Sequence, residues 1–262
     1  MNDVTIASNE ADARAAEAVE EHHAQMAGVL SLKVEALIGV ARTGGDVTAV
    51  RDDLVAWGRD DLLPHAIAEE GTLYRAAAAH ASGRLLVEAM LSEHSFIGAV
   101  IDELATAEDR MSAVAAAGAL KAVFGTHLAK ENDQILPLLV ADPAVSLAGL
   151  LDGMHELLGA EVSDGSAHVH STSEPGQDCT CGEEDGHGYP ELDARTIPHA
   201  IRHATVFGAL DAVRPGKGLV LVAPHDPLPL LAQLERRSPG AFSIDYLTRG
   251  PEAWRLELVR IS

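Results

Sequence analysis

The chain has 262 residues, enough for two domains, and a formal net charge of −21 from 40 acidic and 19 basic residues. This acidic surplus argues against a nucleic-acid-binding protein, because phosphates attract clusters of Lys and Arg. Aromatic residues make up only 3% of the chain, and abundant Ala and Leu exclude an all-β protein and favour helices.

The cellular setting is suggested by features that the sequence lacks. The start, MNDVTIASNEADARAAEAVEEHH, has neither the basic residues nor the apolar run of a secretory signal, and no uncharged apolar stretch reaches about 18 residues. The two cysteines, Cys179 and Cys181, are too few for a disulfide-stapled scaffold. We expect a soluble, cytoplasmic protein with neither a membrane nor a nucleic acid as its partner.

Charge divides the chain into three segments. Residues 1–160 carry 25 acidic and 10 basic residues, residues 161–191 carry 8 acidic and no basic ones, and residues 192–262 carry 7 and 9. The middle segment is rich in Ser, Gly and Asp and nearly devoid of large apolar residues, which predicts a flexible acidic linker. A weakly basic carboxy-terminal domain on this tether can dock on the acidic amino-terminal one.

The first segment, residues 1–160, predicts four long helices. Apolar residues recur at steps of three and four, as in Met26, Leu30 and Val34 of the first helix. Thr43-Gly44-Gly45-Asp46 ends that helix, and the second runs over residues 47–80 with a kink at Pro64. Two more apolar stripes follow, over residues 86–104 and 114–138. Short polar connections between long helices predict an up-down four-helix bundle.

The third segment, residues 192–262, predicts a small two-layer α/β domain. LDART reads as a strand, followed by a helix that starts at Pro198 and ends near residue 213. The breaker RPGKG then precedes the buried strand LVLVAP, and HDPLPLLAQLERR, AFSIDYL and AWRLELVRI read as a helix and two strands. The overall fold class is therefore α plus α/β.

Histidines mark the inner face of each predicted bundle helix. One histidine falls on each helix, at intervals of 42, 29 and 33 residues, and two of the four begin the motif H-x-x-x-E. Residues four apart on a helix share a face, so each such pair can reach one cation. The candidate metal ligands are His23, His65, Glu69, His94, His127 and Glu131.

Such a cluster favours a metal over a plain core. Burying four imidazoles and two carboxylates without a cation would cost much free energy. Imidazole and carboxylate groups in a bundle interior suit two ions of the iron class, although zinc or manganese also accepts these ligands. Six protein ligands underfill two octahedral ions, so positions are left for water, dioxygen, peroxide or nitric oxide.

The stretches EHHAQM, PHAIAEEGTLY, SEHSFIGAV and HLAKENDQILPLL, within residues 20–140, resemble the hemerythrin-like family, also called the HHE cation-binding domain. The resemblance implies a non-haem di-iron centre with a bridging oxo or hydroxo group, held by the same six side chains. Oxygen-storing members carry a second histidine four residues after the ligand on the third helix, where this chain has Gly98. An ion with fewer ligands favours reactivity or sensing over storage.

Three roles fit this expectation. The first is binding or reduction of a small oxidant, such as dioxygen, peroxide or nitric oxide, in oxidative or nitrosative stress. The second is an iron-based redox or oxygen sensor that signals through the carboxy-terminal domain, and the third is iron delivery or iron-sulfur repair.

Some positions near the six ligands stay open. His23 is favoured over His22 because apolar residues follow it at three, seven and eleven positions. Glu69 is favoured over its neighbour Glu70, which a rotated helix would bring inward. Tyr74 either donates a hydrogen bond to a bound ligand or packs in the apolar core, and packing is the favoured alternative. His80, near a helix end, and His155 are weaker candidates.

Other histidines and the cysteines form weaker patterns. Cys179 and Cys181 form C-x-C, whereas zinc sites space cysteines by two to four residues, so exposed thiols in a tether are favoured. His199 and His203 stand four apart and His225 precedes the next helix, where capping and loop roles are favoured over a metal.

The stretches LDARTIP, VFGAL, LVAPHDPLPLLAQLE and RGPEAWRLEL, within residues 192–262, resemble family 2249 of domains of unknown function, a fold similar to sulfur-carrier TusA-like domains. Sulfur carriers need a cysteine near the start of the first helix, because the thiolate is the nucleophile. His199 and its neighbours supply none, so we do not expect sulfur transfer.

Overall fold

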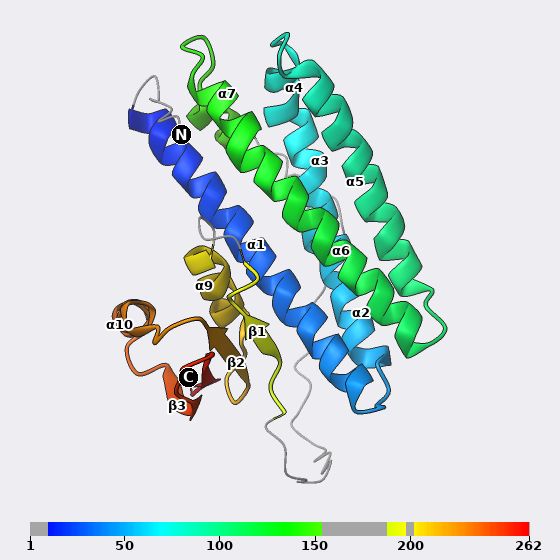
Figure 1. The fold of residues 1–262 in the computed structure, drawn as a ribbon. Helices are drawn as coiled ribbons and strands as arrows, with labels where there is room; N and C mark the ends of the chain where they lie inside the picture. Colours follow the sequence, from blue (N-terminus) through cyan, green and yellow to red (C-terminus); the bar gives the residue numbers. More distant parts are fainter. Residues whose placement is uncertain (1–9, 154–187, 198–201, 262) are drawn as a thin grey trace, which may run out of the picture.

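The computed structural model describes residues 10–153, 188–197 and 202–261. Its amino-terminal part is a bundle of four roughly antiparallel rods (Figure 1). The rods are α1 (Glu10–Arg42); α2 (Thr48–Trp57), the π-helical turn η1 (Gly58–Leu62), α3 (Leu63–Gly71) and α4 (Leu73–Ala78); α5 (Arg84–Ala105); and α6 (Arg110–Lys130), the π-helical turn η2 (Glu131–Ile135) and α7 (Leu136–Val140). Residues 147–153 are also helical. The α plus α/β fold class is confirmed.

Local chemistry sets the ends of several helices. Gly44, with a φ of +80°, turns the chain after α1. The Asp46 carboxylate accepts a hydrogen bond from the Thr48 N–H at 2.9 Å, and the Asp109 side chain accepts from the N–H groups of Met111 and Ser112 to cap α6. These hydrogen bonds satisfy N–H groups at the start of each helix that have no partner within its first turn.

The second rod departs from the prediction of one kink at Pro64. The π turn η1 precedes Pro64, with the Leu63 N–H bonded to the Gly58 carbonyl five residues back, and a second break lies at Thr72, whose φ is −122° and ψ −85°. A proline lacks the N–H that a regular helix needs, so a wider turn fits there. The fourth rod repeats the arrangement, with η2 just before Leu136-Pro137.

Two apolar clusters fill the bundle, one towards each end. The first includes Met26, Leu62, Ile97, Phe124 and Leu128. The second includes Val19, Leu73, Met90, Ile135 and Leu139. On every rod the six candidate ligands fall in sequence between members of the two clusters, so a polar layer separates two apolar ones.

The carboxy-terminal part is a four-stranded mixed sheet with two helices. Its elements are β1 (Glu191–Asp193), α9 (Arg202–Ala212), β2 (Gly218–Ala223), α10 (Leu228–Arg237), β3 (Phe242–Thr248) and β4 (Trp254–Arg260). The strand order is β1-β2-β4-β3, with β1 parallel to β2 and the other pairs antiparallel. In register, Leu219 faces Leu258 and Leu221 faces Leu256, and these leucines share a core with Phe207 and Leu234.

The two parts touch where α9 lies along α1 (Figure 1). A Cβ added to Gly28 would lie 2.4 Å from the Ala209 nitrogen, and one added to Gly208 would lie 2.4 Å from the Gln25 Cα. Each helix therefore presents a glycine that lets the two backbones approach closely. The predicted linker, with Cys179 and Cys181, lies almost wholly outside the described residues.

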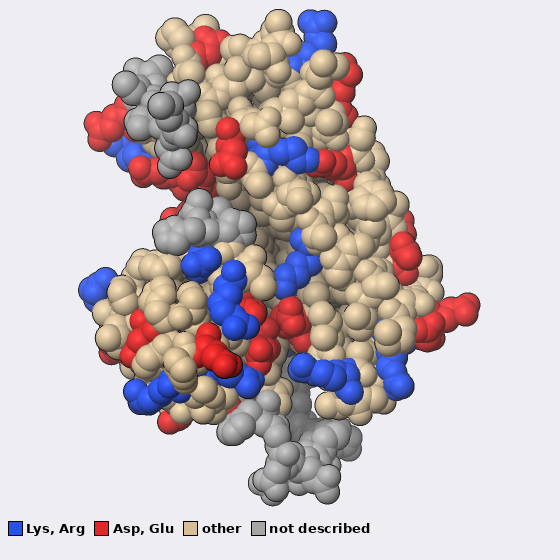
Figure 2. All heavy atoms as spheres, in the orientation of Figure 1, with Lys and Arg blue, Asp and Glu red and all other residues tan. Residues whose placement is uncertain are grey.

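A cleft of about 320 Å³ opens beside this helix crossing. Its walls include Glu17, Glu20 and Glu21 from α1 and Phe207 and Arg237 from the carboxy-terminal part. Figure 2 shows the molecule hollowed there. Burial raises the pKa of Glu20. The charge of His23 lowers this pKa, whereas the nearby carboxylates of Asp133 and Glu17 raise it further.

Two described helical stretches, Glu10–Arg42 and Arg110–Val140, are long and apolar enough to cross a membrane by length and composition alone. Core helices of soluble proteins pass the same test. Both stretches carry buried histidine in the bundle interior, His23 on one and His127 on the other.

Candidate metal centre

The four rods bring all six candidate ligands together. α1 supplies His23, α3 supplies His65 and Glu69, α5 supplies His94, and the fourth rod supplies His127 with Glu131 at the first position of η2. None of the six side chains is more than 6% exposed. The helical spacing of H-x-x-x-E puts each histidine and its carboxylate on one face, turned inward.

One half of the cluster, called here the first lobe, consists of His23, His65 and Glu69. Glu69 Oε1 lies 3.1 Å from His23 Nε2 and 3.1 Å from His65 Nε2. The contact to His23 is a hydrogen bond, whereas the contact to His65 lacks hydrogen-bond geometry. One carboxylate oxygen thus faces two imidazole nitrogens.

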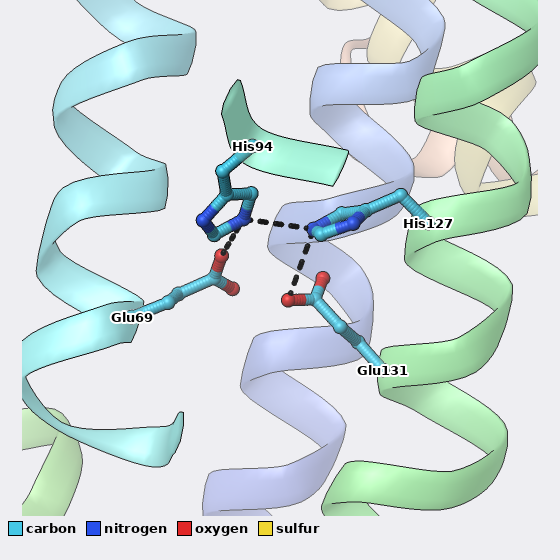
Figure 3. A group of neighbouring side chains, drawn as sticks. All are labelled: Glu69, His94, His127 and Glu131. Atoms are coloured by element: carbon cyan, nitrogen blue, oxygen red, sulfur yellow. Dashed lines mark hydrogen bonds and ion pairs between the residues drawn. The ribbon is translucent and has the colours of Figure 1, made fainter. Parts of the chain in front are cut away.

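The other half, the second lobe, consists of Glu69, His94, His127 and Glu131 (Figure 3). His94 Nε2 lies 3.0 Å from His127 Nε2, and His127 Nε2 lies 3.3 Å from Glu131 Oε1. The second oxygen of Glu69 is 3.9 Å from His94 Nε2. Glu69 belongs to both lobes, so its two oxygens face different sets of nitrogens.

Tyr74 adds a seventh polar group that the sequence did not clearly predict. It is 1% exposed, and its hydroxyl donates a short hydrogen bond to Glu131 Oε1. The same hydroxyl lies 3.2 Å from His127 Nε2 and 3.4 Å from His94 Nε2. Burial and the Glu131 and Glu69 charges raise the pKa of Tyr74, so the phenol keeps its proton.

The outer nitrogens of three histidines are held by acceptors. His23 Nδ1 is 2.7 Å from Asn132 Oδ1, and His94 Nδ1 is 2.8 Å from Glu70 Oε1. His127 Nδ1 is 3.0 Å from Glu93 Oε2. Such acceptors fix the tautomer of a ligating histidine and aim its other nitrogen at the metal. The sequence offered one signal for them, because each acceptor directly adjoins a candidate ligand in the chain.

The charges within the layer support one another. Burial by itself lowers the pKa of His23, but its hydrogen bond to Glu69 and the charges of Glu131 and Glu69 raise that pKa to about 9. Burial raises the pKa of Glu69, but the charge of His65, together with the hydrogen bond and charge of His23, holds it well below its usual range. Carboxylates and protonated imidazoles therefore balance each other in the metal-free protein.

The donor set fits a metal cation. Within the described part of the chain, both ring nitrogens of His65 and Glu131 Oε2 are buried without a hydrogen-bond partner, which is costly in a finished core. The Nε2 atoms of His94 and His127 face each other, and two such nitrogens can share only one proton. A cation in each lobe would engage His65 Nε2, Glu131 Oε2 and the facing Nε2 atoms of His94 and His127, which are nitrogen and oxygen ligands that divalent transition metals accept.

The structure separates the remaining candidate residues into those at the centre and those away from it. His23 is buried and His22 exposed, and Glu69 points inward while Glu70 is partly exposed behind His94. His80 lies 3.2 Å from Asp142, away from the centre. His203 and His225 are exposed, and neither belongs to the groups of metal-ligating side chains found among the described residues. His155, His199, Cys179 and Cys181 lie outside the described residues.

Comparison with family models agrees with this geometry. Residues 14–139 match the model described as "Hemerythrin HHE cation binding domain". The bundle is an HHE domain. It contains all six candidate ligands, and this description together with the buried His and Glu cluster supports a metal-binding protein.

The carboxy-terminal part matches a second model. Residues 191–260 match the family described as "Uncharacterized conserved protein (DUF2249)". Both family resemblances predicted from the sequence are thus confirmed. No curated protein and no solved structure gave a match to the chain.

Proposed function

We propose that the protein is a cytoplasmic non-haem di-iron protein that binds or reduces a small oxidant such as dioxygen, peroxide or nitric oxide. The observation that carries the proposal is the double lobe, in which Glu69 is shared between His23 and His65 on one side and His94 and His127 on the other. Iron held there would supply electrons and an open coordination position to the oxidant.

The side chains around the lobes support chemistry in a closed site. Apolar clusters on both sides of the layer exclude bulk water from it, and a dry surrounding shell tunes the potential of a bound metal. The Tyr74 hydroxyl lies next to Glu131, His94 and His127, where it can donate a hydrogen bond to a bound small ligand.

The helix position four residues after His94 also supports reactivity over storage. This position is Gly98, and a Cβ added there would meet only Leu63, at 3.9 Å. No side chain from this position fills the space beside His94. The ion of the second lobe would therefore keep a position open to a small ligand.

Whole-protein metal analysis with an optical spectrum tests the proposal. Full-length protein made with ample iron should contain about two irons per chain, and azide or the oxidant should change its visible absorption. The His127→Ala variant should lose metal, whereas the exposed His203→Ala variant should not. Iron-free protein from iron-rich cells would defeat the proposal.

A second candidate, an iron-based sensor, is favoured by the contact between α1 and α9. The Gln25 Cα that meets Gly208 is two residues beyond His23 on the same helix. A shift of His23 on a change of iron oxidation state would reach α9 through one helical turn. Hydrogen exchange of α9 should then differ between ferrous and ferric protein, and identical exchange would exclude this role.

A further inference from the structure

The outer contacts of the four histidines follow one rule around the bundle. The residue adjacent to a ligand on one rod contacts the histidine of a neighbouring rod. Asn132 beside Glu131 meets His23, Glu70 beside Glu69 meets His94, and Glu93 beside His94 meets His127. The fourth member is His22 beside His23, which meets His65 with ring centroids 4.9 Å apart.

The fourth contact differs from the other three in kind. His65 Nδ1 is buried and has no hydrogen-bond partner among the described residues, and the His22 ring is tilted by 59° against the His65 ring. His65 is thus the one candidate histidine in the cluster without an acceptor to fix its ring. His22 is also exposed, and its imidazole is a metal ligand in its own right.

The two lobes also differ in how their donors are held. Glu131 Oε2 lies 3.8 Å from His23 Nε2, so both carboxylates reach the first lobe, but the outer nitrogen of His65 there has no acceptor in the part of the chain that is described. In the second lobe both histidines have carboxylate acceptors on their outer nitrogens, and Lys130 in turn holds Glu93. A ligating ring that no acceptor fixes lowers the affinity of its site for an ion.

We propose that the first lobe is the exchangeable half of the centre, and that His22 is the transient ligand through which its ion passes between solvent and His65. The second lobe retains its ion. The inference rests on the proposed two-ion centre and assigns His22 to metal transfer and His65 to the loosely held side.

Release of Fe²⁺ from the full-length, iron-loaded protein to a chromogenic ferrous chelator under anaerobic conditions tests the inference. The protein should lose its iron in two phases of equal amplitude, with rates at least about tenfold apart. The His22→Phe variant keeps a ring against His65 but removes the nitrogen ligand. It should slow the fast phase about tenfold and leave both the slow phase and the iron content unchanged.

Two further variants complete the test. Glu93→Gln weakens the acceptor of His127 and should speed only the slow phase. His80→Phe removes a partly exposed histidine that is paired with Asp142 away from the centre, and it should change neither phase.

The outcomes separate this inference from the proposed function. About two irons per chain that leave in one phase overturn the exchangeable lobe but keep the di-iron proposal. An unchanged fast phase in His22→Phe overturns the role of His22, and a faster first phase in Glu93→Gln overturns the assignment of the lobes. Protein that binds no iron overturns both proposals.

Discussion

Tyr74 is the residue on which sequence and structure differ most. A spacing of five residues would place it about 140° away from Glu69 on a regular helix, yet its ring packs in the cluster that contains Leu73 and Met90. The break at Thr72 lies outside any periodic pattern, and it separates α3 from α4 just before Tyr74. The hydroxyl therefore reaches Glu131 on the opposite rod, a contact that apolar periodicity cannot reveal.

Replacing Tyr74 by phenylalanine removes one donor from a buried carboxylate. We expect the metal-free Tyr74→Phe variant to lose about 1–3 kcal/mol in free energy of unfolding, because Glu131 keeps its burial without this hydrogen bond. Urea unfolding measures the change. The control is Tyr246→Phe, whose hydroxyl donates to Asp226 at a partly exposed site, and its cost should be smaller. Equal costs would show that the Tyr74 contact is not special.

The pKa of His23 predicts a pH dependence of the metal-free protein. This pKa is raised from 6.5 to about 9 by Glu69 and Glu131, so the folded state holds a proton that the unfolded chain releases first. The resulting stabilisation is complete below pH 6.5 and is lost as the pH rises through about 9, a loss of up to about 3 kcal/mol.

Urea unfolding of metal-free protein at pH 6 and above pH 9 should therefore give a smaller free energy at the higher pH. His23→Gln should flatten this dependence, because the titrating group is gone. Metal affinity should move the opposite way and rise with pH, since His23 must give up its proton to ligate. Stability that increases over this window would contradict the assigned direction.

At the scale of elements, the π turns explain how two interrupted rods keep their ligands aimed inward. A π turn accommodates one extra residue in an α-helix. Because η1 takes up this extra residue, His65 and Glu69 stay on the helix face that points into the bundle. Deleting the exposed Asp60 should turn η1 into a regular turn, and the bundle should still fold and bind metal. Deleting Gly118 from regular α6 rotates the flanking residues by about 100° and should abolish metal binding.

Metal content and far-ultraviolet circular dichroism of the two deletion variants give the answer. Metal loss from the Asp60 deletion, with its helix content kept, would show that η1 itself shapes the centre.

The arrangement of the rods was predictable and their irregularities were not. The apolar residues and the histidines both follow the period of the α-helix. This period therefore predicted the helices and the six inward-facing side chains. The turns at Gly58 and Glu131 precede Pro64 and Pro137, which lack the N–H that a regular helix needs, and the break at Thr72 follows no such signal. The outer acceptors Glu70, Glu93 and Asn132 likewise depend on which rods are neighbours, and the sequence does not state this.

At the scale of the whole molecule, Gly28 and Gly208 couple the two family units. The sequence suggested that opposite charge would bring them together, whereas the contact described here is a close helix crossing. Gly28→Ala should weaken it, because the new Cβ would lie 2.4 Å from the Thr205 carbonyl oxygen and the Ala209 nitrogen. We expect a cost of about 1–3 kcal/mol and a larger radius of gyration in solution scattering.

Gly118→Ala is the matched control for that substitution. Gly118 also lies inside a long helix, but apart from its own helix backbone no atom of the described residues lies within 4 Å of its added Cβ. The alanine should stabilise the protein by about 0.5–1 kcal/mol and leave the radius unchanged. If Gly28→Ala behaves like this control, the two units do not meet at this crossing in solution.

Anomalous diffraction at the iron edge from crystals of the full-length, iron-loaded protein tests the central claim most directly. The account predicts two iron peaks in the polar layer of the bundle, one beside His23 and His65 and one beside His94 and His127, with Glu69 between them. Peaks at the protein surface, or a bundle interior without iron while the six side chains keep their positions, would contradict it.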